Sequence, residues 1–165
     1  MGDWGGTVRR VRRLWLSTWH PRSWWRAILV RRFPALYRYP GWDNVQITLI
    51  RFGFDCDNGW ARILWDLSRS LDQIRREHGG DLRASQVKEK YATLRFYYDA
   101  WDFPSQDVYD AIDALIDAAE ARSARTCEHC GRRGTLCHTR GGMWFRTLCP
   151  RCARRQGYER VPEPA

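Results

Sequence analysis

The sequence predicts an α+β protein in which a small antiparallel sheet packs against two helices. Mixed strand and helix periodicities in the middle of the chain predict this fold. Two further observations predict what flanks it: two CxxC pairs near the C-terminal end indicate a cysteine-rich lobe, and nine arginines against one acid in the first 40 residues indicate a basic arm. The expected organisation is a basic, Trp-rich helical arm over 1–40, an α+β domain over 41–125, a cysteine-rich lobe over 126–157 and a flexible tail over 158–165. Ten tryptophans in 165 residues supply the apolar area that a compact core needs.

The arm interleaves arginines with large aromatic residues. Helical spacing of apolar residues from Val8 to Trp19 predicts a first helix, which ends at Pro21. A second short helix is expected to stop at Phe33-Pro34. Its apolar face is expected to consist of Trp24, Ala27 and Ile28. Both helices are therefore predicted to be amphipathic and basic.

Four interpretations of the arm remain open. In the first the arm lies on an anionic membrane surface, and in the second its arginines bind nucleic-acid phosphates while its aromatic rings stack on bases. In the third it docks on a partner protein, and in the fourth it folds back onto the protein's own core. A membrane span is excluded, because the longest apolar run, residues 27–30, holds four residues and a spanning helix needs about 18. The arm residues expected to contact nucleic acid or a partner are Arg9, Arg10, Arg12, Arg13, Trp15, Trp19, Trp24 and Trp25.

Residues 41–125 have the composition of an ordinary globular domain, with eleven basic against fifteen acidic side chains. Their periodicities predict, in order, a strand over 45–54, a helix from Trp60 to Ile74, strands over 86–90 and 94–99, and a helix from Ser105 to Ala119. Asp57-Asn58-Gly59 offers an N-cap for the first helix, and Gly79-Gly80 ends it. The apolar faces of the two helices are expected to form the core.

The cysteines of the C-terminal lobe form two CxxC pairs. Eighteen residues (131–148) separate the pair Cys127 and Cys130 from the pair Cys149 and Cys152. At this spacing four thiolates close tetrahedrally on one zinc ion, each pair supplying two ligands from a tight turn. The sequence therefore predicts one structural Zn²⁺ held by the four cysteines. Two disulfides in a secreted domain are the alternative, disfavoured because the N-terminus does not look like a secretory signal.

Between the two pairs the sequence predicts a β-hairpin. Residues 134–140 and 143–148 are expected to be strands joined by a turn at Gly141-Gly142, and Ala153 is the expected start of a short helix. The order of knuckle, hairpin, knuckle and helix resembles a treble-clef or zinc-ribbon finger. We call residues 126–157 the finger.

A longer stretch of the chain resembles a protein family. Residues 86–98 read QVKEKYATLRFYY, and an acidic helix, TCEHCG at 126–131 and TLC at 147–149 follow. This order resembles a family of small, uncharacterised proteins of bacteria and their phages with a VKEKF-GLRFYY block and a C-terminal CxxC finger, over about residues 59–153. The resemblance implies that the protein comes from a bacterium or a phage and is located in the cytoplasm of the bacterium or infected host. It implies no particular activity. Ala92 stands where that pattern usually has glycine, and the arm is not part of it.

The sequence contains no motif for catalysis. Phosphate loops, GxSxG elbows and HExxH pairs are absent. Cys56 lies between two aspartates, which disfavour its thiolate, so it is interpreted as structural. A zinc-stabilised nuclease using His138 is disfavoured, because residues 146–155 hold no His, Asn, Asp or Glu. His129, Cys137 and His138 are interpreted as ordinary hairpin or knuckle residues; the alternative is that each replaces a metal ligand or lies next to the ligands.

The interpretation that these patterns favour is a non-enzymatic zinc-finger protein without a small-molecule substrate. It is expected to be a phage or bacterial regulator or inhibitor that binds nucleic acid or a nucleic-acid-associated host protein complex. The alternative is a protein-only adaptor or assembly subunit whose Trp-rich arm is its interface, and a peripheral binder of anionic membranes is disfavoured. The finger residues expected to contact phosphates are Arg132, Arg133, Arg140, Arg146, Arg151, Arg154 and Arg155. Trp144 is expected either to stack on a base or to pack over the zinc site.

Overall fold

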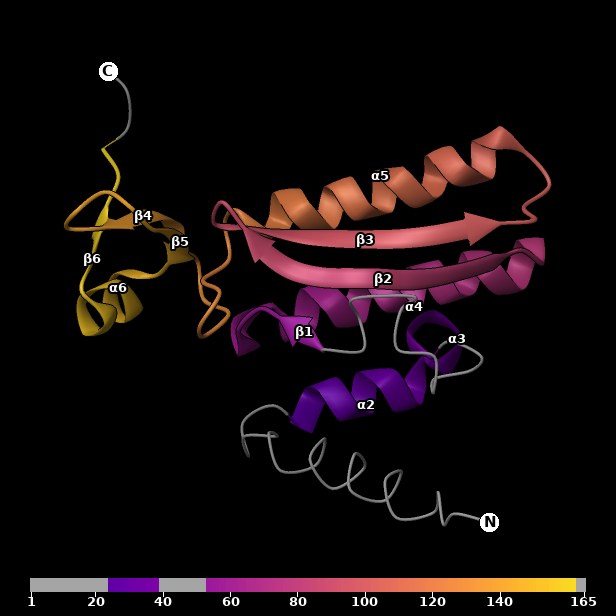
Figure 1. The fold of residues 1–165 in the computed structure, drawn as a ribbon, viewed down its shortest axis with the longest axis horizontal. Helices are drawn as coiled ribbons and strands as arrows, with labels where there is room; N and C mark the ends of the chain where they lie inside the picture. The colour runs from indigo at the N-terminus through magenta and orange to yellow at the C-terminus, as the bar shows by residue number, and fades with distance from the viewer. Residues whose placement is uncertain (1–23, 39–52, 163–165) are drawn as a thin grey trace, which may run out of the picture.

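Two three-stranded sheets organise the computed structural model, which describes residues 24–38 and 53–162 (Figure 1). The larger sheet has the strand order β1-β2-β3, and the smaller one, in the finger, has the order β5-β4-β6. The strands are β1 (Phe54–Asp55), β2 (Asp81–Lys90), β3 (Thr93–Trp101), β4 (Thr135–Thr139), β5 (Phe145–Leu148) and β6 (Tyr158–Arg160). The helices are α2 (Trp24–Arg32), α3 (Pro34–Tyr37), the 3₁₀ turn η3 (Asn58–Trp60), α4 (Ala61–His78), α5 (Gln106–Ser123) and α6 (Pro150–Gln156). The described residues therefore form an α+β fold.

The larger sheet is mixed, whereas the sequence predicted an antiparallel one. β2 and β3 form an antiparallel hairpin, but β1 runs parallel to β2 and pairs Phe54 with Val87. Parallel neighbours need a crossover connection, which α4 supplies here. The prediction was wrong because strand direction depends on which strands pair, and local periodicity does not show this. The predicted strand over 45–54 lies outside the described residues except for its last two positions.

α4 begins one residue later than predicted and ends at the predicted glycine. The Asp57 side chain accepts a hydrogen bond of 2.8 Å from the Asn58 amide and so caps η3, after which α4 starts at Ala61. Gly79 has a φ of 77°, the left-handed conformation that commonly closes a helix. Its amide donates to the Arg75 carbonyl at 3.0 Å.

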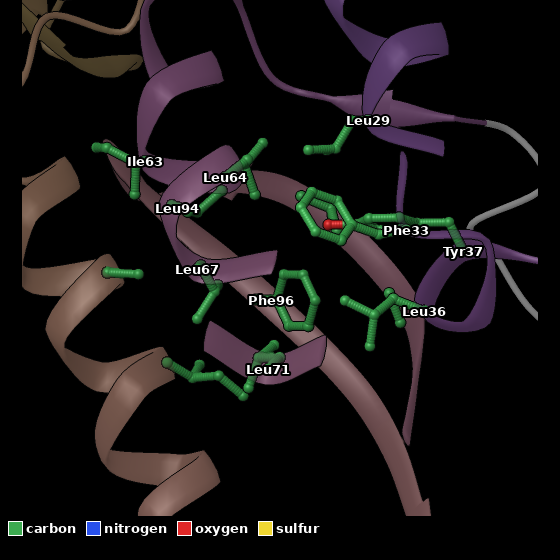
Figure 2. Packing of buried hydrophobic residues seen from close by; sticks show 14 of the residues in the cluster. Leu29, Phe33, Leu36, Tyr37, Ile63, Leu64, Leu67, Leu71, Leu94 and Phe96 are labelled. Carbon is green, nitrogen blue, oxygen red and sulfur yellow. The ribbon is translucent and has the colours of Figure 1, made fainter. Parts of the chain in front are cut away.

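The main core lies between the helices and the β2–β3 hairpin. α5 runs alongside β3, and α4 contacts both α5 and β2 (Figure 1). Leu64, Leu67 and Leu71 of α4 meet Leu94 and Phe96 of β3 in one buried cluster (Figure 2). Burying each of these side chains stabilises the fold by roughly 1.5–3 kcal/mol, so the spacing of apolar residues in α4 fixes its buried face.

α5 also covers the outer edge of the larger sheet. β3 is the last strand of that sheet, yet the Leu94 amide donates to Ser123 Oγ at 2.8 Å and the Phe96 amide to Glu120 Oε1 at 3.2 Å. Glu120 Oε2 in addition lies 2.6 Å from Arg95 Nη1. Side chains from a helix thus take the place of a neighbouring strand along this part of β3.

The described part of the predicted arm, residues 24–38, packs on the protein's own core. Trp24 is 64% exposed and Ile28 41% exposed, so the apolar face predicted from these residues faces solvent. The buried face instead starts at Leu29 and continues into α3. Its core residues are Leu29, Phe33, Leu36 and Tyr37. The first predicted helix, from Val8 to Trp19, lies outside the described residues.

A buried hydroxyl pair fixes α3 against α4, and a substitution tests it. Tyr37 Oη lies 2.6 Å from Ser68 Oγ, which itself lies 2.6 Å from the Leu64 carbonyl oxygen. Tyr37→Phe keeps the ring and removes this contact. We expect the free energy of unfolding to fall by about 1 kcal/mol in urea titrations. Tyr91→Phe is the control, because Tyr91 is 76% exposed; equal losses in both variants would contradict the assignment.

The β2–β3 turn holds two non-glycine residues in left-handed conformations. Tyr91 has a φ of 51° and Ala92 a φ of 64°, as two-residue hairpin turns of type I′ require. The turn is held from both sides, because the Ala92 amide donates to Glu89 Oε1 at 2.6 Å and its carbonyl accepts from Thr147 Oγ1 at 2.7 Å. These hydrogen bonds explain how alanine occupies a position that suits glycine.

Candidate metal centre

The four cysteines of the two CxxC pairs meet at one point. The sulfur atoms of Cys127, Cys130, Cys149 and Cys152 all lie within 4.8 Å of one another, and Cys130 Sγ is 3.6 Å from Cys149 Sγ. Four sulfurs placed 2.3 Å from a tetrahedral ion would be about 3.8 Å apart. The cluster therefore has the size and the donor set to hold one metal ion.

Two tight turns position the sulfurs. In the first, the Gly131 amide donates to the Cys127 carbonyl at 2.9 Å, and Gly131 has a φ of 76°. In the second, Cys149 is the N-cap of α6, with Pro150 at the first helical position. α6 therefore begins at Pro150, three residues earlier than predicted, and Cys152 lies in its first turn.

The thiols differ in how readily they ionise. Burial raises the pKa of Cys127 and of Cys152. Burial acts in the same direction on Cys149, but hydrogen bonds from the Cys152 backbone and from the neighbouring thiols outweigh it and lower the pKa of Cys149 to about 6. Because zinc binds thiolates, a cation entering this site would displace the protons that the thiols still carry.

The first knuckle of the finger lies directly against the main domain. The Gly59 amide donates to the Glu128 carbonyl at 2.6 Å, and Trp60 Nε1 donates to the Thr126 carbonyl at 2.8 Å. A Cβ atom on Gly59 would lie 2.1 Å from the Cys127 carbonyl oxygen. Only glycine permits this approach, so the position of the first ligand pair depends on the start of α4.

Glu128, which sequence reasoning did not single out, is the central polar contact of this junction. Its side chain is fully buried, and its Oε1 accepts from the Asp57 amide at 3.1 Å. Its Oε2 lies 3.3 Å from Arg146 Nε but is not aligned for a hydrogen bond. Burial raises the pKa of Glu128, and the Arg146 guanidinium opposes this rise. The sequence around Glu128 did not indicate this role, because its partners Asp57 and Arg146 lie elsewhere in the chain.

The predicted finger arginines fall into two groups. Arg146 neutralises Glu128 and donates to Gln156 Oε1 at 3.4 Å, and Arg140 lies 3.1 Å from Glu159 Oε1. The other five are exposed, and no ion pair among the described residues involves them. They are Arg132, Arg133, Arg151, Arg154 and Arg155.

The predicted aromatic contacts also divide. Trp144 is 70% exposed at the tip of the β4–β5 hairpin, so it does not pack over the cysteine cluster. Trp24 is exposed, whereas Trp25 packs against Phe54 and donates from Nε1 to Asn58 Oδ1 at 2.8 Å. The remaining predicted arm contacts, Arg9, Arg10, Arg12, Arg13, Trp15 and Trp19, lie outside the described residues.

The alternative ligands stand apart from the cluster. His129 Nδ1 is 2.7 Å from Asp57 Oδ2, and His138 Nδ1 is 2.7 Å from the Thr139 carbonyl. Cys137 is buried with its thiol directed to the Thr135 carbonyl at 3.4 Å. In the main domain, burial raises the pKa of Cys56 to about 12, so this thiol is not a reactive thiolate.

Within the described ranges, no helix combines the length and apolar character that crossing a bilayer demands. Comparison of the chain with protein-family models, with curated proteins and with solved structures found no match.

Proposed function

We propose that this is a non-enzymatic zinc-binding protein whose finger binds nucleic acid. Four thiol donors form a closed set, which suits a structural metal and leaves no position for a substrate. When bound, the metal would stabilise the two knuckles and the hairpin between them. We place the protein in the cytoplasm of a bacterium or a phage-infected host, where thiols stay reduced and available for zinc.

The exposed finger arginines support the nucleic-acid part of this proposal. Arg151, Arg154 and Arg155 are spaced three and four residues apart, so they share one face of α6. Each is exposed and lacks a carboxylate partner among the described ion pairs, which leaves its guanidinium available for a phosphate. Cys152 and Ala153 hold the other side of α6 against the cysteine cluster. The metal centre would thus provide a rigid base for a basic surface.

One observation favours a second candidate, a protein-only adaptor. Met143 is 78% exposed and Trp144 70% exposed at the hairpin tip, and large exposed apolar side chains of this kind are frequent anchors in protein interfaces. This candidate predicts that the full-length protein binds neither DNA nor RNA at about 0.15 M salt.

A salt titration of zinc-loaded protein tests the proposal. The logarithm of the binding constant is expected to fall linearly with the logarithm of salt concentration, by about 0.7–0.9 for each phosphate contacted. Arg154→Ala combined with Arg155→Ala removes two contacts and should reduce the slope by about 1.4–1.8. The measurement is fluorescence anisotropy with labelled DNA and RNA.

The matched control for this titration is Arg62→Ala, because Arg62 is an exposed arginine of α4 that already pairs with Asp66. Its slope should equal that of the wild type. A slope that is the same for the wild type and for the α6 double variant would show that the finger does not contact phosphates.

A further inference from the structure

The β2–β3 hairpin has one buried face and one that is turned away from the core. Leu82, Ala84, Val87, Leu94 and Phe96 belong to the main hydrophobic cluster. Their neighbours along each strand point to the opposite side. We call this side the outer face; it consists of Asp81, Arg83, Gln86, Lys88 and Lys90 of β2 and Thr93, Arg95, Tyr97, Asp99 and Trp101 of β3. It is a polar face with two large aromatic rings.

The two rings of the outer face are accessible and spaced along one strand. Tyr97 is 40% exposed and Trp101 is 39% exposed. They are four residues apart on β3, which places them on the same side of the strand and about 13 Å apart. Lys88 Nζ lies 5.2 Å from the Tyr97 ring centroid, and Arg83 Cζ lies 5.5 Å from the Trp101 ring. Each ring therefore has a cation beside it.

The cations of the outer face differ in whether a carboxylate holds them. Arg83 lies 2.7 Å from Asp81 Oδ2, and Arg95 lies 2.6 Å from Glu120 Oε2. Among the described ion pairs, in contrast, none includes Lys88 or Lys90, which are the two lysines of the whole chain. Lys90 Nζ instead lies 5.5 Å from the Tyr91 ring centroid. Both ammonium groups can therefore reach an anionic ligand without breaking an ion pair.

Two exposed aromatic rings on a sheet face, together with two lysines that no described ion pair holds, match the chemistry of unpaired bases linked by phosphates. Bases stack on aromatic side chains regardless of their identity, while lysines follow the phosphate backbone. A duplex hides the faces of its bases in the helical stack and offers the rings nothing to stack on. We infer that the outer face is a binding platform for single-stranded nucleic acid. This inference rests on the proposed function and adds to it a surface and a class of ligand.

Binding of a 12-nucleotide oligo(U) and oligo(dT) strand, compared with a duplex of 12 base pairs, tests the platform. The zinc-loaded protein is expected to prefer the single strands. Tyr97→Ala and Trp101→Ala should each weaken single-strand binding by about tenfold. Tyr97→Leu and Trp101→Leu, which keep an apolar side chain, should show the same loss, and this separates stacking from a local change in the strand.

The lysines have a separate readout. Lys88→Gln combined with Lys90→Gln should reduce the salt slope for single strands by about 1.4, as expected for two phosphate contacts. Ile28→Ala is the control for the rings, because Ile28 is an apolar side chain of α2 that is 41% exposed and belongs to neither proposed binding surface. It should bind like the wild type.

Three outcomes separate the platform from the proposed function. Loss of single-strand binding in the ring variants, but not in Ile28→Ala, supports the platform. If the wild type binds, the α6 arginine variant binds less and the ring variants bind normally, the platform is refuted and the finger remains the binding surface. If the wild type binds neither form, the proposed function fails together with the inference.

Discussion

Replacing Cys149 by serine, or removing the metal with a chelator, is expected to unfold the finger while α4 and α5 remain helical. Half of the finger's buried hydrophobic cluster consists of three of the ligands themselves, Cys127, Cys149 and Cys152; the other half is Cys137, Leu148 and Ala153. So small a core does not hold two knuckles and a hairpin without the metal. Structural zinc contributes on the order of 10 kcal/mol to such segments at neutral pH, more than any other single contribution here.

Metal analysis and hydrogen exchange measure this effect. The purified protein should contain one zinc per chain, and the backbone amides of β4 and β5 should lose protection when it is removed. Cys137→Ser is the matched control, because Cys137 is a buried cysteine of the finger that does not belong to the group of four clustered sulfur atoms. This variant should still bind one metal ion, and its free energy of unfolding should fall by about 1 kcal/mol. Equal metal loss in both variants would show that the ligand set is wrong.

Gly59→Ala is expected to be the most damaging single substitution outside the cysteines. Its Cβ would lie 2.1 Å from the Cys127 carbonyl oxygen, 2.4 Å from that of Glu128 and 2.6 Å from the Gly131 amide nitrogen. All three are backbone atoms of the first knuckle, so no side-chain rotation relieves the clash. Either the knuckle moves away from α4 or the helix start unwinds. We expect the free energy of unfolding, measured by thermal or urea unfolding, to fall by about 3 kcal/mol, the upper end of the usual cost of overpacking.

The same variant should also weaken zinc binding, because the knuckle that moves carries two ligands. Competition with a coloured zinc chelator measures this second effect. Gly141→Ala is the control: an added Cβ there would meet only Met143 Cγ, at 3.9 Å. If Gly59→Ala and Gly141→Ala have the same free energy of unfolding and the same affinity for zinc, the finger does not depend on its contact with the main domain.

Local sequence patterns predicted the elements whose signals are contained within them. The apolar spacing from Trp60 to Ile74 placed α4, and the paired cysteines predicted the four members of the cluster. The buried face of α2 was predicted wrongly for a physical reason. Apolar residues surround this short helix on almost every side, so spacing alone does not distinguish the exposed Ile28 from the buried Leu29.

The features that sequence reasoning missed depend on contacts between distant segments. The parallel pairing of β1 with β2 joins residues about thirty positions apart, and Glu128 meets Asp57 across 71 positions. The β2–β3 turn was hidden for another reason: Tyr91-Ala92 lacks the glycine or asparagine that usually marks a two-residue turn. Hydrogen bonds to Glu89 and Thr147 hold this turn instead.

The hydrogen bonds from α5 to the outer edge of β3 have a consequence for self-association. An uncovered edge strand of this length would recruit a strand from another molecule and seed aggregates. The side chains of Glu120 and Ser123 accept hydrogen bonds from the backbone amides of Phe96 and Leu94. These amides are therefore not available to another strand at the end of β3 nearest the finger. Shortening Glu120 to alanine would therefore free an amide for a neighbouring chain, and its first consequence would be a loss of solubility at high concentration.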